Sequence, residues 1–373
     1  MMELQEYGYR SVAKSAGPYQ LPSLIAGVKN CVEGLAQVTA GEEVLVLADY
    51  EVDPVVIQAF MAVCSYLGAK IHLLHTRPFS LGGKDEHNPS DLVVAAYKAA
   101  DVVFSLCWFP DIHTKKMPMH LSTEMNTRWV SLYQMATVEC LSSPAASYPL
   151  PILFELTKRM KELCERTNEI RVTSPEGTDL TFTVRPENIG GGAVEPLRIG
   201  GYTRAAFPLS ALGIFPPVDA EGVICSHDNY ITGYSEQALR LKVHENMVVE
   251  ISGGGPGEAD AIRRYLQGPE KVDRFPLIEA QWGLNPKARI KGATQIEQER
   301  LATTLHFGVG TEFHQQGVWD THNDFGIPTP TIYFDGVAMV KDRQLSLLAD
   351  PAIRQVAAQY GDPDDLLTCN IYI

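Results

Sequence analysis

The change of hydrophobic periodicity part-way along the chain most constrains its fold. In the first half, short apolar runs alternate with longer helical patterns, which is typical of βαβ units around a parallel sheet. After about residue 167 the pattern changes to period-two runs separated by turn dipeptides. We therefore expect an α/β domain with a parallel sheet over residues 1–167 and a strand-rich α+β domain over residues 168–373. A length of 373 residues suits two domains of about 150 residues or more.

The elements of these domains are predicted from the same patterns. In the first half, strands are expected at 44–47, 70–74, 102–106 and 129–132, and helices at 53–67, 90–100, 121–126 and 153–166. In the second half, period-two runs lie at 170–173, 180–184 and 239–251. Asp335-Gly336, within residues 331–340, predicts a hairpin with a tight type I′ turn. A last helix is expected at 350–359, because Pro351 suits a first helical position.

Composition excludes several classes of protein. The hydrophobic share of 45% and the charged share of 20% exclude a disordered chain. The net charge is −14, and no basic patch interrupts it, so we expect neither nucleic acid nor an acidic membrane as a partner. No apolar run reaches the roughly 20 residues of a membrane helix. The polar N-terminus and seven scattered cysteines without a Cys-x-x-Cys pair predict a cytoplasmic protein with reduced thiols.

The glycine clusters do not predict a nucleotide site. Residues 190–192 and 253–257 are rich in glycine, but no Lys-Ser/Thr pair follows either cluster, and neither has the Gly-x-Gly-x-x-Gly spacing. The sequence also lacks the Gly-x-Ser-x-Gly motif of serine hydrolases. We expect turns at both clusters.

The strongest chemical signal is a His-x-Asp pair formed by His322 and Asp324. On an extended strand, residues two apart point to the same face, about 6.6 Å apart along the chain, and so can bind one ion together. Upstream, Glu279 or His306 can supply a third ligand. Such a set leaves open positions for a substrate and for oxygen or water. The alternative is a surface pair at a turn.

The motifs around these residues resemble a known superfamily. Glu279 precedes the sequence Trp-Gly-Leu-Asn-Pro at 282–286, and residues 299–310 include His306-Phe-Gly-Val-Gly before His322-Asn-Asp324. This order is similar to the metal-binding half of the aminopeptidase T/aminopeptidase S metallopeptidases. The related 2,5-dihydroxypyridine 5,6-dioxygenases are more similar in length and in the first half, notably around 42–53, 67–69 and 99–103. The resemblance covers most of the chain and implies the two-domain fold expected above.

The resemblance also implies roles for individual residues. The His-x-Asp pair of both branches falls on His322 and Asp324, and a third ligand falls on Glu279. In the peptidases this place holds a metal-bridging Glu, and His306 matches a ligand of a second ion. In the dioxygenases the position of Glu279 is a His that completes a two-His, one-carboxylate iron site, so this sequence departs from that pattern. One His and two carboxylates still suit Fe(II) or Mn(II), because both ions accept oxygen ligands.

Residues outside this cluster are candidates as well. His113 resembles the interdomain base of the dioxygenases and follows a predicted strand, at the edge where ligands of parallel sheets gather. A His there suits removal of a proton from a ring hydroxyl, although it is equally typical of an exposed loop. Glu221 is a weaker candidate for a second bridging carboxylate of the peptidase branch. Four aromatic residues flank the proposed ligands and are more typical of a core than of a pocket: Trp282, Phe307, Trp319 and Phe325.

Three functions remain open from the sequence. The leading hypothesis is a dioxygenase with one non-haem metal ion, Fe(II) in the first place, that uses O₂ to open a hydroxylated pyridine or similar small aromatic ring. The second is a metalloaminopeptidase with Zn, Co or Mn, which gains support if His306 points into the metal cluster. The third is a metal-free binding protein with the same fold. Both enzyme branches tend to self-associate, so the resemblance implies a homo-oligomer.

Overall fold

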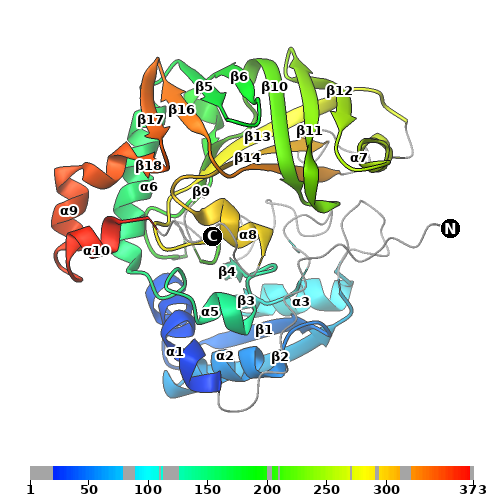
Figure 1. The fold of residues 1–373 in the computed structure, drawn as a ribbon. Coiled ribbons are helices and arrows are strands. Elements are labelled where there is room, and N and C mark those ends of the chain that lie inside the picture. The colour runs from blue at the N-terminus through cyan, green and yellow to red at the C-terminus, as the bar shows by residue number, and fades with distance from the viewer. Residues whose placement is uncertain are drawn as a thin grey trace.

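The computed structural model describes residues 20–78, 89–108, 111, 126–199, 204–208, 211–268, 271–289, 294–310 and 321–369. Two sheets organise the described chain, and they lie in different parts of the molecule (Figure 1). The parallel sheet and its helices occupy the lower part of this view, and the strand-rich region occupies the upper part. The helix α8 lies between them. The predicted α/β plus strand-rich architecture is therefore confirmed.

The first sheet has the strand order β2-β1-β3-β4-β8, and every pairing in it is parallel. Its strands are β1 (Glu43–Asp49), β2 (Lys70–Thr76), β3 (Val102–Ser105), β4 (Arg128–Ser131) and β8 (Arg204–Ala206). All four strands predicted for the first half are confirmed. The chain returns to this sheet with β8, from beyond residue 167. The boundary at residue 167 stays a prediction.

Helices cover both faces of the parallel sheet because β1 is apolar on both sides. Val44 and Val46 belong to the cluster that also contains buried side chains of α1 and α2, whereas Leu45 and Leu47 pack in a separate cluster with α3. Burial on both faces is typical of parallel strands. The helices of this region are α1 (Leu21–Lys29) with the π-helical turn Asn30–Leu35, α2 (Pro54–Tyr66), α3 (Asp91–Ala99) and α5 (Val138–Leu141). The helix α6 (Leu150–Cys164) leads out of this region and lies along the left side of the strand-rich part in Figure 1.

The predicted helices of the first half agree with α2, α3 and α6. Asp53 and Ser90 are the N-caps of α2 and α3, and their side chains accept hydrogen bonds from the backbone amides of Val55 and Val93. The helix predicted at 121–126 lies almost entirely outside the described residues.

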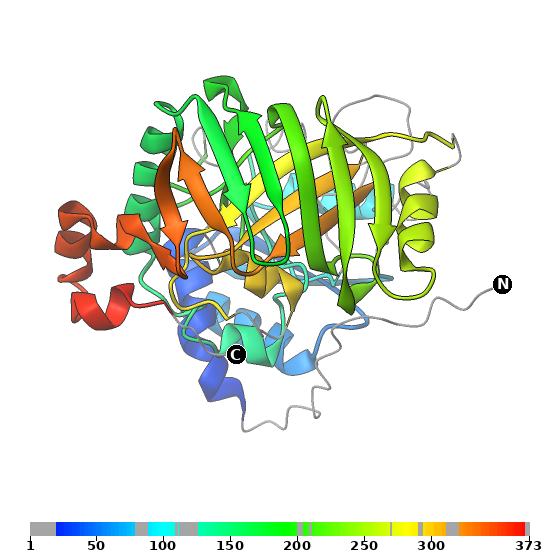
Figure 2. The same cartoon turned by 45° about the horizontal axis from the view of Figure 1, so that its top comes forward.

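The second sheet is large and its pairings are antiparallel. Its strands are β5 (Glu169–Thr173), β6 (Asp179–Thr183), β7 (Ile189–Gly190), β9 (Ala211–Ile214), β10 (Val218–Asn229), β11 (Gly233–His244), β12 (Met247–Gly253), β13 (Phe275–Gly283), β14 (Leu305–Gly310), β15 (His322–Ile327), β16 (Thr331–Phe334), β17 (Val337–Lys341) and β18 (Gln344–Leu345). Figure 2, in which the top of the molecule comes forward, shows these strands as a broad fan. The pairings from β10 through β11, β12, β13, β14 and β15 return to β10, so these strands form a closed ring.

Short helices accompany this sheet. They are η5 (Pro186–Asn188), α7 (Glu258–Gln267), α8 (Gln295–Arg300), η6 (Ser346–Ala349), α9 (Pro351–Ala357) and α10 (Pro363–Leu367). The helix predicted at 350–359 is confirmed as α9, with Asp350 as its N-cap. None of the helices in the described part of the chain combines the length and apolar character that a membrane crossing requires.

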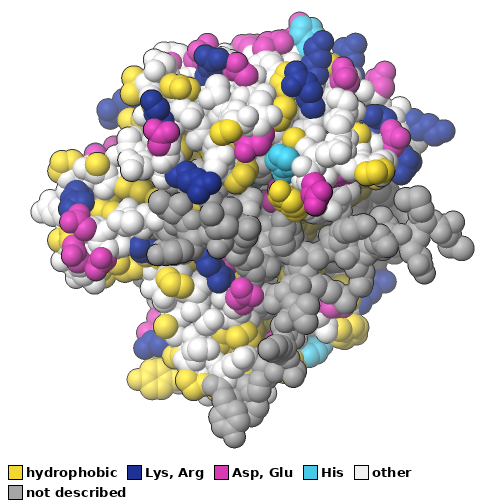
Figure 3. Space-filling view, in the orientation of Figure 1, with side chains coloured by type: hydrophobic (Ala, Val, Ile, Leu, Met, Phe, Trp, Pro, Cys, Tyr) yellow, Lys and Arg dark blue, Asp and Glu magenta, His cyan; other side chains and the backbone are white. Residues whose placement is uncertain are grey.

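Two turns in the strand-rich region show what the sequence patterns determine. Asp335 and Gly336 adopt positive φ between β16 and β17, which confirms the predicted hairpin. The run at 239–251 is not one strand, because Glu245 and Asn246 also adopt positive φ and reverse the chain between β11 and β12. On the face seen in Figure 3, acidic and basic side chains are interspersed over the described surface.

Candidate metal centre

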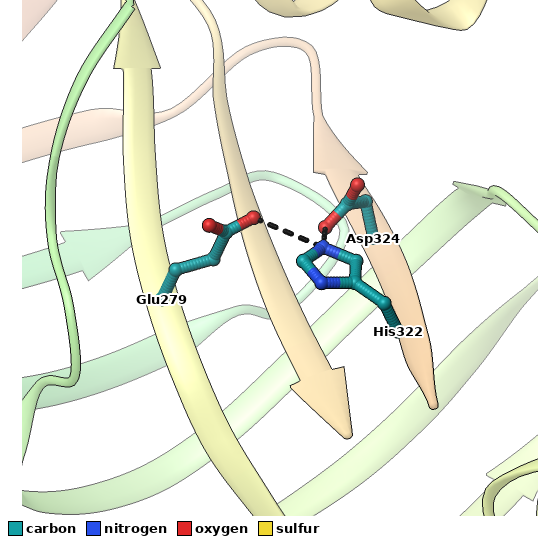
Figure 4. A group of neighbouring side chains, drawn as sticks. All are labelled: Glu279, His322 and Asp324. Atoms are coloured by element: carbon teal, nitrogen blue, oxygen red, sulfur yellow. Dashed lines mark hydrogen bonds and ion pairs between the residues drawn. The ribbon is translucent and has the colours of Figure 1, made fainter. Parts of the chain in front are cut away.

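Three adjacent strands bring Glu279, His322 and Asp324 together. Glu279 on β13 pairs with Gly308 on β14, and Gly308 pairs with Asp324 on β15. Paired residues of antiparallel strands point to the same face, and His322 lies two residues before Asp324 on that face. Figure 4 shows the Glu279 carboxylate reaching across β14 toward the two residues of β15. The expected side-by-side placement of His322 and Asp324 therefore exists in the fold.

A β-bulge in β13 determines which side chain reaches the cluster. Leu277 pairs with Val309 but Glu279 pairs with Gly308, so Ile278 is an extra residue in β13. With regular pairing, Ile278 would stand opposite Gly308. The bulge places a carboxylate there instead of an apolar side chain.

The donor atoms of this group are close enough to share one ion. His322 Nε2 lies 2.8 Å from Asp324 Oδ1 and 3.3 Å from Glu279 Oε1. The three donor atoms all lie within 4.8 Å of one another. All three residues are buried, with exposed fractions of 6–7%. Buried charged groups are expected to be paired or to coordinate a metal, because an isolated buried charge is costly.

Gly308 provides the space between the ligands. A Cβ atom at this position would lie 2.5 Å from Cγ and 2.9 Å from Oε1 of Glu279. Any other residue would therefore displace the carboxylate or fill the gap that an ion needs. With bonds of about 2.0–2.2 Å, the donors of one ion lie at most about 4.4 Å apart. The distances of 2.8 and 3.3 Å from Nε2 of His322 to the two carboxylates fall within that limit. The geometry and the carboxylate and imidazole donors thus fit a divalent metal ion.

His306 points into the same cluster. Its Nε2 lies 3.3 Å from Oε1 of Glu279, and its Nδ1 lies 3.9 Å from Oε2 of Glu299. Glu299, His306 and Asp324 form a second buried group whose donors are close enough to hold an ion. A His306 side chain in this position is the one expected of a metalloaminopeptidase. Asp324 belongs to both groups, so two ions would share it.

The electrostatics of the cluster follow from burial and from close opposite charges. Burial disfavours the charged form of Glu279, but His322 and His306 outweigh it and lower the pKa of Glu279 well below its usual range. Burial raises the pKa of Glu299 to about 7, with His306 opposing the shift. For His306, burial lowers the pKa, but the neighbouring Glu299 and Glu279 outweigh it and raise the pKa to about 9.

The helix α8 supplies charged residues that sequence reasoning did not single out as site residues. All six residues of α8 are buried, including Glu297, Glu299 and Arg300. The N-cap Thr294 accepts a hydrogen bond from the backbone amide of Glu297, and Thr-x-x-Glu is a capping-box pattern that predicts a helix start. That pattern indicates the helix but not its burial, so only the fold reveals that Glu299 and Arg300 lie beside the candidate site.

Other predicted site residues lie elsewhere. Glu221 is exposed at the other end of β10, where it accepts hydrogen bonds from the backbone amide of Glu245 and pairs with His244. It is not in either ligand group, so the structure gives no support for a bridging role. His113 and Trp319 lie outside the described residues. The three other flanking aromatic residues are fully buried in the main core, as expected for core residues: Trp282, Phe307 and Phe325.

A comparison with protein families decides between the two branches. The profile of the 2,5-dihydroxypyridine 5,6-dioxygenase family matches residues 28–346 of the chain, which include both ligand groups. The chain belongs to the 2,5-dihydroxypyridine 5,6-dioxygenase family. Within this dioxygenase family, the chain presents one imidazole and two carboxylates in its first ligand group. No curated protein matches it in sequence.

Solved structures share the fold of this dioxygenase family member. It is similar to the 2,5-dihydroxypyridine dioxygenase from Pseudomonas putida KT2440, with a TM-score of 0.64, 19% identity, and coverage of 91% of this chain and 100% of that one. It is also similar to wild-type AmpT from Thermus thermophilus, with a TM-score of 0.60, 14% identity, and coverage of 87% and 99%. At these identities the likeness shows the fold that both proteins share with this chain.

Proposed function

We propose that this protein is a metal-dependent dioxygenase that opens a hydroxylated pyridine or a similar small aromatic ring. The observation that carries the proposal is the family match over a chain whose buried cluster of Glu279, His322 and Asp324 fits a metal ion. In such a reaction both atoms of O₂ enter the product as the ring bond breaks. The partners are therefore an aromatic substrate and O₂.

Glu279, His322 and Asp324 are the residues that would hold the ion. Two carboxylates and an imidazole suit Fe(II), which we propose as the native metal, and also Mn(II). A bound Fe(II) ion supplies a redox-active centre where the ring and O₂ meet. The sheet positions the three side chains before substrate arrives, since each comes from a paired strand.

Further residues act on the substrate or its surroundings in this proposal. His306 lies between Glu279 and Glu299 and keeps the Glu279 side chain in position. Because His306 and Glu299 are buried, they exclude water from this side of the cluster. His113 is proposed to take a proton from a ring hydroxyl, and it lies outside the described residues. Self-association is proposed from the family resemblance, and light scattering of the purified protein tests it.

Oxygen uptake tests the proposed function. Protein reconstituted with Fe(II) is mixed with 2,5-dihydroxypyridine, and O₂ consumption is recorded beside loss of the ring absorbance. We expect equal amounts of ring and O₂ to be consumed, and we expect His322→Ala to abolish the reaction. Uptake by the wild type no faster than by His322→Ala would show that the proposal is wrong.

Hydrolysis is the second candidate, because one observation specifically favours it. The group of Glu299, His306 and Asp324 offers a second ion position beside the first, and paired ions about 3.5–4 Å apart activate water in many hydrolases. Hydrolysis of aminoacyl anilides with Zn(II), Co(II) or Mn(II), without ring-dependent O₂ uptake, would favour this function over ring opening.

A further inference from the structure

The guanidinium of Arg300 is a buried cation next to the metal cluster. Arg300 is 4% exposed, and it donates hydrogen bonds to Gln281 Oε1 at 3.2 Å and to the phenol oxygen of Tyr133 at 3.1 Å. Both acceptors are neutral. The nearest carboxylate oxygen among the described residues belongs to Glu299, at 3.9 Å. A carboxylate that neutralised Arg300 would make two parallel hydrogen bonds at about 2.7–2.9 Å.

A second buried polar group, near Tyr133, is poorly satisfied. The phenol oxygen of Tyr230 is buried, and among the described residues it has only a contact with the side chain of Gln134, which is not a hydrogen bond of good geometry. Leaving a buried hydroxyl poorly paired is unfavourable, so such groups are rare unless a ligand or water satisfies them. This hydroxyl therefore indicates that something with a hydrogen-bonding atom binds here.

Tyr230 lies close to the cluster and to Tyr133. Its backbone amide donates a hydrogen bond to the carbonyl oxygen of Asp324 at 3.0 Å. Tyr230 and Tyr133 pack against the same small apolar cluster, which includes Ile296 of α8. A phenol is a hydrogen-bond donor.

These groups come from both parts of the fold. Tyr133 follows β4 at the carboxyl end of the parallel sheet, which is where ligands of open parallel sheets bind. Arg300 belongs to α8, and Tyr230 lies in the turn between β10 and β11. Tyr133 is thus hydrogen-bonded to Arg300 and lies near Tyr230, whose backbone contacts Asp324 of the cluster. A guanidinium beside phenol groups is well suited to an anionic oxygen, because all of them donate hydrogen bonds.

We propose that Arg300, Tyr133 and Tyr230 form a subsite that binds an anionic oxygen substituent of the aromatic substrate. This inference rests on the proposed function and deepens it: the substrate is a ring with an ionised hydroxyl or a carboxylate. The subsite holds the substituent while the metal ligands hold the reacting part of the ring. Binding at two points fixes the orientation of the ring, which determines which bond opens.

Ligand binding without turnover tests the subsite. Metal-loaded protein is titrated under nitrogen with 2,5-dihydroxypyridine and with the matched pair 5-hydroxypyridine-2-carboxylate and 5-hydroxypyridine-2-carboxamide, which differ in charge but not in shape. We expect Tyr230→Phe to weaken binding of the anionic ring about 10-fold and Arg300→Gln to weaken it about 10- to 100-fold. The carboxamide should change by less than about 3-fold.

The ligand whose affinity falls in the variants shows which group of the ring supplies the anionic oxygen. Weakened binding of 2,5-dihydroxypyridine alone identifies an ionised hydroxyl, and weakened binding of the carboxylate alone identifies a carboxylate. Both results support the subsite. Unchanged affinity of both variants for both anionic rings would overturn it, as would a wild-type protein that binds neither ring.

Thermal unfolding separates a binding role from a structural one. Tyr230→Phe removes a hydroxyl that makes no hydrogen bond of good geometry to the described residues, so the melting temperature of the ligand-free protein should not fall. The matched control is Tyr148→Phe, whose hydroxyl donates to the backbone carbonyl of Leu366 away from the site. This control should lower the melting temperature and leave ligand affinity unchanged. A lowered melting temperature with unchanged affinity in Tyr230→Phe would overturn the subsite.

The outcomes also separate this inference from the proposed function. If the wild type takes up O₂ with the ring and the variants bind as the wild type does, the subsite is wrong and the function stands. If the variants lose affinity for anionic rings but no ring supports O₂ uptake, the subsite stands and ring opening is wrong.

Discussion

Two groups of buried carboxylates in this molecule differ in how they are satisfied. At the carboxyl end of the parallel sheet, Asp49 accepts hydrogen bonds from the backbone amides of Trp108 at 2.7 Å and Glu51 at 2.9 Å. Asp111 accepts from the hydroxyls of Tyr97 and Ser131. Each carboxylate thus has both oxygens occupied by ordinary donors.

The carboxylates on β13 to β15 and α8 are arranged otherwise. Glu279 and Asp324 face imidazole rings rather than backbone amides or hydroxyl groups. Oε1 of Glu299 is buried without a partner in the described chain. Burial of a carboxylate alone therefore does not indicate a metal site. Carboxylates with neutral donors on both oxygens stabilise the fold, whereas we propose that the carboxylates gathered with imidazoles bind a metal ion.

The strongest way to test this difference is the substitution Asp324→Asn. Asp324 is shared by both candidate ligand groups, so its loss should lower the metal content below half of the wild-type value. Activity should fall by about 10³-fold, which is more than the 10- to 100-fold typical of changes to residues that only support a ligand. Metal analysis of the reconstituted protein and O₂ uptake check both. Full metal content in Asp324→Asn would show that Asp324 is not a metal ligand and that the two groups of carboxylates do not differ in this way.

Filling the space between the ligands should have the next largest effect. Gly308→Ala places a Cβ atom 2.5 Å from Cγ of Glu279, so we expect metal affinity to fall about 10- to 100-fold. The matched control is Gly361→Ala, where the nearest atom would be a Leu366 methyl carbon at 3.4 Å. Competition with a coloured chelator measures both affinities. Equal affinities in the two variants would contradict the role given to Gly308.

The reciprocal test is Asp49→Asn in the parallel sheet. The amide group cannot accept both backbone hydrogen bonds, so the free energy of unfolding should fall by about 1–3 kcal/mol. Metal content should not change, because Asp49 is in neither ligand group. Urea unfolding and metal analysis provide the two readouts. Loss of metal with unchanged stability would show that Asp49 serves metal binding rather than the fold.

The smallest expected effect concerns pH. Burial opposes the charged form of His306, but Glu299 and Glu279 outweigh it and raise its pKa to about 9. The stabilisation from protonated His306 is therefore fully present below the unfolded pKa of about 6.5 and is lost as the pH rises through about 9. The melting temperature of the metal-free wild type should fall more over this range than that of His306→Gln. Parallel pH curves for the two proteins would show that His306 has no such role.

Local patterns predicted those parts of the fold that depend on neighbouring residues. The strand β1 is apolar on both faces and α2 begins at the cap Asp53, so both were predictable from the sequence. The pairing of His322 with Asp324 on β15 was predictable for the same reason, since residues two apart share a face of any strand. Their role as metal ligands stays a prediction.

Contacts between distant segments were not predictable from one sequence. The bulge at Ile278, which places Glu279 opposite Gly308, depends on the register between β13 and β14. The return of β8 to the first sheet depends on packing about 70 residues after β4. Burial of Glu299 and Arg300 depends on where α8 docks. Sequence identifies residues that are able to bind an ion, but register and docking determine which of them meet.

Anomalous scattering at the iron edge, from crystals of Fe(II)-reconstituted protein grown without oxygen, tests whether Glu279, His322 and Asp324 bind the metal ion. We predict one strong peak per chain, about 2.0–2.3 Å from donor atoms of Glu279, His322 and Asp324. A map without a peak at these three residues, from protein shown to contain iron, would contradict the account.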